Sequence, residues 1–109
     1  MTLAPAKSCI PLHRSMLENV VDVIHRPGHL SFDEARRMAD REAAKRATHP
    51  MLLAWYDHAR GVFSPNVECC ESTRPAWLVY AQSRGADVTI AVNGLDYVFL
   101  YRSTDPDDL

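Results

Sequence analysis

The chain has 109 residues, of which 47% are hydrophobic and 24% charged, a composition typical of one globular domain. Its formal net charge of −2 argues against a nucleic-acid partner or an anionic membrane surface. No apolar run approaches the ~20 residues that span a bilayer, and no export signal opens the chain. Three cysteines, an odd number, form no disulfide framework and fit a reducing compartment. We therefore expect a cytoplasmic protein.

Residues 1–14 show no hydrophobic periodicity and are expected to form a flexible N-terminal segment. The next apolar stretch, Leu17–His25, is ambiguous. Ser15 and Glu18 have the spacing of a helix-capping box, whereas the many β-branched residues of the stretch favour a strand. We favour an edge strand that leads into a helix.

The helix that follows is predicted over about Phe32–Thr48. Ser31 and Glu34 form a capping box at its start, and His49-Pro50 ends it. Its apolar residues fall on one helical face and are mostly alanine, so the helix is expected to approach the layer beneath it closely. The mixed charges of the other residues are typical of a solvated face.

After the helix, the period of the apolar residues changes to alternation, which indicates strands. We predict a strand at Met51–Asp57 with a short partner at Val62-Phe63, and another at Ala76–Gln82. A tight loop leads from there to a strand at Asp87–Asn93. Asn93-Gly94 is a hairpin signal before the last strand, Tyr97–Arg102. The remaining residues, 103–109, form an acidic tail that is expected to be flexible.

Pairing these strands by parity predicts the face of the sheet that the helix covers. It comprises Trp77, Val79, Ala81, Val88, Ile90, Val92, Tyr97 and Phe99. The opposite face is not cleanly polar, as a water-facing antiparallel sheet would be. It carries Ala91 and four larger residues, which are the predicted interface: Leu78, Tyr80, Val98 and Leu100. Either the N-terminal segment or a second copy of the chain should cover them, and we favour a homodimer.

Standard catalytic and cofactor motifs are absent from the sequence. Its unusual feature is the adjacent pair Cys69-Cys70 between two glutamates. Such a pair could bind zinc or iron with His58, Asp57, His49 or His25 as further ligands, form a disulfide, or supply a reactive thiolate. The flanking carboxylates disfavour a thiolate. Because free cysteines are commonly buried as small apolar residues, a role in packing is the competing interpretation.

Two other clusters have weaker chemical meaning. Asp57 beside His58 could act as a general acid or base near neutral pH, and Arg84 could bind an anion. Both lie in predicted turns, where polar residues are ordinarily just solvated. No substrate is specified by either cluster.

Several segments together resemble a known family. These are Met51–Asp57 (MLLAWYD), Ser64–Cys70 (SPNVECC), Pro75–Ala81 (PAWLVYA), Ser83–Asp87 (SRGAD) and Tyr97–Tyr101 (YVFLY). They are similar to the Archaeoglobus AF1514-like domains, small prokaryotic domains of unknown function. The resemblance covers about residues 19–102 and implies a compact two-layer α+β domain. It implies no activity, catalytic residue or cofactor.

The expected fold is a single α+β domain over residues 15–102, with one long helix on an antiparallel sheet of about four to five strands. The expected function is a non-catalytic binding or interaction module that homodimerises through the second sheet face, with no cofactor. The alternative is a thiol or metal-binding protein, redox-active or holding zinc or iron, with Cys69, Cys70 and His58 as the site. Whether the protein is an enzyme is left open by the sequence.

Overall fold

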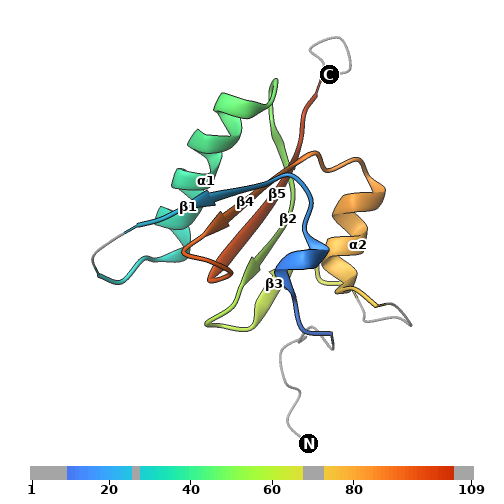
Figure 1. Cartoon of the computed structure of the whole chain (residues 1–109), viewed down its shortest axis with the longest axis horizontal. Coiled ribbons are helices and arrows are strands. Elements are labelled where there is room, and N and C mark those ends of the chain that lie inside the picture. The colour runs from blue at the N-terminus through green and yellow to red at the C-terminus, as the bar shows by residue number, and fades with distance from the viewer. Residues whose placement is uncertain (1–9, 26–27, 68–72, 105–109) are drawn as a thin grey trace, which may run out of the picture.

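The computed structural model describes residues 10–25, 28–67 and 73–104. These form one five-stranded sheet and two α-helices, which lie on opposite faces of the sheet (Figure 1). None of the helices within these ranges is long and apolar enough to cross a membrane. The elements in chain order are a short 3-10 helix at Arg14–Met16, β1 at Val20–Val23, α1 at Phe32–Arg46, β2 at Met51–Asp57, β3 at Val62–Ser64, α2 at Ala76–Ser83, β4 at Val88–Val92 and β5 at Tyr97–Arg102.

The sheet has the strand order β1-β4-β5-β2-β3. The β4–β5, β5–β2 and β2–β3 pairs are antiparallel, but β1 runs parallel to β4. The expected α+β class is thus confirmed, whereas the sheet is mixed rather than antiparallel. The edge-strand interpretation of the ambiguous N-terminal stretch is confirmed, because β1 borders the sheet along β4 only.

The hairpin of β4 and β5 forms the centre of the sheet, in the predicted parity. Val88 lies opposite Tyr101, Ile90 opposite Phe99, and Val92 opposite Tyr97. Both residues of Asn93-Gly94 adopt positive φ angles, of 51° and 75°, which is the conformation that these two residue types tolerate best.

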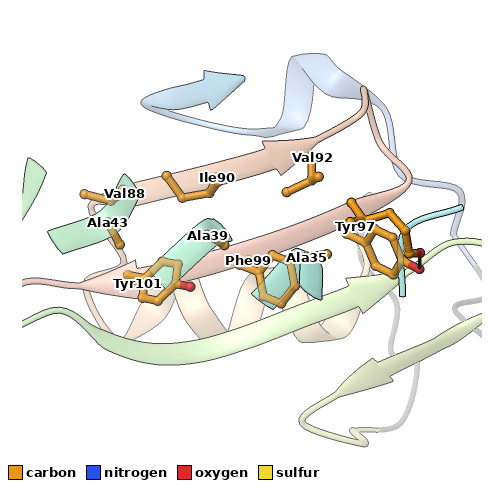
Figure 2. Packing of buried hydrophobic residues seen from close by; sticks show 10 residues of the cluster. Ala35, Ala39, Ala43, Val88, Ile90, Val92, Tyr97, Phe99 and Tyr101 are labelled. Atoms are coloured by element: carbon orange, nitrogen blue, oxygen red, sulfur yellow. Dashed lines mark hydrogen bonds between the residues drawn. The ribbon is translucent and has the colours of Figure 1, made fainter. Parts of the chain in front are cut away.

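Helix α1 packs on this central hairpin through small side chains. The predicted capping box is present, with the Ser31 side chain accepting from the backbone of Glu34. Ala35, Ala39 and Ala43 are fully buried and face β4 and β5, so that the helix backbone approaches the sheet closely (Figure 2). The helix ends at Arg46, two residues before the predicted end.

The predicted strand at Ala76–Gln82 is wrong, because this segment is helix α2. Pro75 precedes the helix, and Gly85, with φ of 86°, ends it. The backbone N–H of Gly85 donates to Gln82 O and that of Ala86 to Ala81 O, which is a Schellman motif with glycine at its left-handed position.

Helix α2 covers the second face of the sheet, which was predicted to be a dimer interface. Leu78, Val98 and Leu100 are at most 1% exposed and belong to one cluster with Leu17 from the N-terminal segment. Tyr80 is half-buried. Three of the four predicted interface residues are therefore covered within the chain itself. Trp77 and Ala81, predicted beneath α1, also lie in this second cluster.

Candidate functional site

A pocket of about 320 Å³ opens at the end of the sheet where β2 ends and β4 turns into β5. The N-terminal segment, the end of β2 and the β4–β5 turn each contribute to its wall. Its lining residues are Pro11, Leu12, Tyr56, His58, Leu95 and Asp96. The pocket therefore joins apolar surface to a phenol, an imidazole and a carboxylate.

Tyr56 is held in place by helix α2. Its ring stacks on the indole of Trp77, with a centroid separation of 5.3 Å and an interplanar angle of 7°. Trp77 is fully buried, so the stack fixes the plane of the Tyr56 ring. Burial, and secondarily the charge of Asp57, raise the pKa of the Tyr56 hydroxyl above its ordinary value. A phenol is protonated at physiological pH in any case, and the raised pKa extends this to more alkaline solution, so the hydroxyl keeps its proton for hydrogen bonding.

His58 follows β2 directly and is anchored at two points. Its backbone N–H donates to Asp96 O at 3.0 Å, and its Nδ1 lies 3.1 Å from the hydroxyl oxygen of Tyr56. When the neutral phenol donates to Nδ1, the imidazole proton resides on Nε2. The exposed imidazole then presents an N–H donor on its outer edge.

Asp57, between these two residues, serves the turn rather than the imidazole. It is fully buried. Its Oδ1 accepts from the backbone N–H of Arg60 at 3.2 Å, and its Oδ2 lies 3.7 Å from Arg60 Nη1. Within the described residues, Oδ2 has no hydrogen-bond partner. Because the His58 ring bonds to Tyr56, the structure does not make the catalytic pairing suggested by the adjacent Asp57 and His58.

The predicted metal site cannot be assembled from the described part of the chain. Cys69 and Cys70 lie outside it. His49 and His58 lie at opposite ends of β2, and His25 follows β1. In residues 10–25, 28–67 and 73–104, no three His, Cys, Asp or Glu side chains form a group that could hold a metal ion.

Arg84, predicted as a possible anion ligand, instead lies over the Tyr80 ring, with its guanidinium carbon 3.7 Å from the ring centroid. This is a cation–π contact on the surface of α2. It gives Arg84 a structural partner.

Sequence reasoning found His58 but missed most of the other pocket residues. Tyr56 and His58 are two apart on an extended segment, a spacing that places them on the same side. This spacing could have predicted that Tyr56 lies beside His58. Leu12, Leu95 and Asp96 reach the pocket only through tertiary structure, and no local pattern distinguishes them.

Comparisons with known proteins agree with this fold. A family model described as "Domain of unknown function (DUF5619)" matches residues 18–101. An uncharacterised protein of Archaeoglobus fulgidus is 39% identical over 70 residues, which are 64% of this chain and 74% of that protein. The crystal structure of the novel protein AF1514 from the same organism has 31% sequence identity and a TM-score of 0.70. The match covers 83% of this chain and 99% of that one.

Proposed function

We propose that this chain, which belongs to the DUF5619 family of domains of unknown function, is a non-catalytic module that binds a small organic molecule. The observation that carries the proposal is the pocket lined by Tyr56, His58 and Asp96 on its polar side and by Leu12 and Leu95 on its apolar side. Its volume of about 320 Å³ lies at the lower end of the range for small-molecule sites.

The chemistry of the lining favours a ligand with an apolar body and a positively charged or hydrogen-bond-donating group. Leu12 and Leu95 provide contact for the apolar body, and the Asp96 carboxylate accepts hydrogen bonds. Tyr56 is preorganised by its stack on Trp77, so little side-chain freedom is lost on binding.

Binding without catalysis is supported by the roles of the titratable residues. Asp57 is engaged by the Arg60 backbone and does not orient His58. The Tyr56 hydroxyl is protonated at physiological pH, as tyrosine ordinarily is, and burial raises its pKa further, so it is a poor nucleophile or base. The six lining residues include no serine, threonine, cysteine or lysine.

The test is a titration followed by amide chemical shifts, with phenethylamine as the probe and 3-phenylpropionate as a control of opposite charge. We expect saturable shifts at residues 56–58 and 95–96 with phenethylamine only. Asp96→Asn should weaken binding about tenfold, as expected for a lost charged hydrogen bond. Asp33→Asn, an exposed aspartate in the first turn of α1, is the matched control. The absence of a saturable response at these residues would contradict the proposal.

Homodimerisation through the second sheet face is not part of this proposal. The expectation depended on uncovered apolar residues, and Leu78, Val98 and Leu100 are covered by the chain's own elements. Light scattering on the wild-type protein would measure the molar mass directly.

A further inference from the structure

A second pocket, of about 230 Å³, lies between the end of β1 and the first turns of α1. It lies on the face of the sheet that α1 covers, because Leu30 and Met38 belong to the cluster beneath α1. The pocket at His58 lies on the opposite face, where Leu12, Tyr56 and Leu95 pack with α2. Its lining residues are His25, Leu30, Glu34, Arg37, Met38 and Arg41. Three of these six residues have basic side chains, namely His25, Arg37 and Arg41.

The walls of this second pocket are fixed by hydrogen bonds from the central hairpin. The backbone N–H of His25 donates to Asn93 Oδ1 at 2.8 Å. The Tyr97 hydroxyl donates to the carbonyl of Leu30 at 2.7 Å, and Leu30 is only 5% exposed. The segment after β1 is therefore tied to Asn93 in the β4–β5 turn, and the residue before the α1 cap is tied to Tyr97 at the start of β5.

Arg37 and Arg41 lie one turn apart on α1, and no described carboxylate forms a salt bridge with either of them. Elsewhere on the helix, Arg36 pairs with Asp40, and both Lys45 and Arg46 pair with Glu42. Among the residues that the structure describes, no carboxylate lies within 4.0 Å of either guanidinium lining the pocket. Two neighbouring guanidinium groups therefore have donors available to a ligand.

The one acidic residue of the lining, Glu34, is engaged in the helix cap. Its Oε1 accepts from the Ser31 hydroxyl at 3.0 Å and from the Ser31 backbone N–H at 3.3 Å. These bonds are the main reason that its pKa is lowered, with smaller contributions from the charges of Arg37 and His25. The Glu34 carboxylate thus has its own donors in Ser31, and the two arginines still exceed it by one positive charge.

We propose that this pocket binds a compact oxyanion, a carboxylate or phosphate group, between the guanidinium groups of Arg37 and Arg41. The planar fork of arginine matches both groups in a bidentate manner. The volume of about 230 Å³ suits such a group better than a drug-sized ligand, since those occupy ~300 Å³ or more. Leu30 and Met38 form the apolar part of the wall.

The experiment is a titration of the 15N-labelled protein with inorganic phosphate and, separately, with acetate, each compared with chloride at equal ionic strength. We expect saturable amide shifts at His25 and at residues 34–41 with at least one of the two anions, and the anion that binds more tightly identifies the class. Arg37→Gln and Arg41→Gln should each raise the dissociation constant about tenfold, the loss expected for one charge-assisted contact.

The matched control is Arg46→Gln, which removes the same charge from the last turn of the same helix, outside the pocket. It should leave the dissociation constant within about twofold, because Arg46 does not line the pocket and its charge reaches the site only through solvent, where it is screened. The proposal is overturned if neither anion gives a saturable response at residues 25 and 34–41, or if Arg46→Gln weakens binding as much as Arg37→Gln. Because the phenethylamine test reports on residues 56–58 and 95–96, either proposal can fail without the other.

Discussion

Replacing Leu78 by alanine tests the position of α2 most directly. Leu78 is fully buried between α2 and the sheet, and the substitution removes three carbon atoms. At about 0.8 kcal/mol for each buried carbon, the transfer contribution is about 2.4 kcal/mol. The cavity that remains adds to it, so we expect a loss of about 3–4 kcal/mol in the free energy of unfolding. This is a large part of the ~5–15 kcal/mol that stabilises a typical domain.

Urea unfolding followed by tryptophan fluorescence measures this loss. With an m-value of about 1.5–2 kcal/mol/M, the midpoint should fall by about 2 M. Ile24→Ala is the control, because Ile24 is 61% exposed and its truncation should cost about 0.5 kcal/mol.

Leu78→Asp separates burial within one chain from burial between two copies. Because it places an unpaired carboxylate in the core, the variant should unfold as a monomeric chain. If it instead remains folded with the wild-type midpoint, while light scattering shows that its molar mass has halved, Leu78 lies between two copies and the position of α2 is wrong.

Three further substitutions test the local features of the fold. Gly85→Ala should lower the free energy of unfolding in urea by about 1–2 kcal/mol, because the φ angle of Gly85 is 86° and alanine disfavours this conformation. The cost is conformational rather than steric, since an added Cβ meets only Arg102 Cδ at 3.8 Å. An unchanged midpoint would contradict the Schellman end of α2. Ser31→Ala should cost about 1 kcal/mol at pH 7. The hydrogen bonds of Ser31 lower the pKa of Glu34, so the part of this cost that depends on the Glu34 carboxylate is present above the unfolded-state pKa and is lost as pH falls through the folded one. The bond from the Glu34 N–H to Ser31 Oγ remains, so the cost should be smaller at pH 2, and an equal cost would argue against the Glu34 half of the capping box. Burial and the hydrogen bond to Asp40 raise the pKa of Tyr101 well above its ordinary value, so the stability that its protonated hydroxyl contributes is complete below about pH 10 and is lost as pH rises further. Tyr101→Phe should make this alkaline loss of stability shallower in unfolding measured from pH 8 to 11. An identical slope in the variant would refute the role of the hydroxyl.

Elements with local signals were predictable from the sequence. The Ser31–Glu34 spacing located the start of α1, and alternation located β2 and β5 with their observed bounds. The parity of β4 and β5 was also correct, because the Asn93-Gly94 turn that joins them sets their register. Each of these features depends on residues within one element or on two strands joined by a short turn.

Helix α2 was mistaken for a strand because it is short and apolar on most sides. Eight residues with a buried tryptophan and leucine next to each other have no clear helical period, and short apolar runs of this kind fit either structure. The useful signals were at the ends, namely Pro75 before the segment and Gly85 two residues after it. Gly85 was interpreted as part of a hairpin loop, although it fits a helix end equally well.

The candidate site and the parallel pairing of β1 required tertiary information. His58 and Tyr56 are close in sequence, but Asp96 reaches them through the β5–β2 pairing, in which Asp57 lies opposite Tyr97. Likewise, Val20 lies opposite Thr89, and no local pattern links strands so distant along the chain.

The strand order has a consequence for how the chain acquires its structure during synthesis. The hairpin strands β4 and β5 are the last two in chain order, and they separate β1 from β2. Among the strands that the structure describes, β1 has no neighbour until residues 88–102 have been made. The pair that can form before then is the β2–β3 hairpin, which in isolation is marginally stable at best. Helix α1 likewise has no hairpin against which to bury its alanines. Folding should therefore be nearly all-or-none and follow the synthesis of the final hairpin, and a chain truncated before Val88 should behave as an unfolded polypeptide.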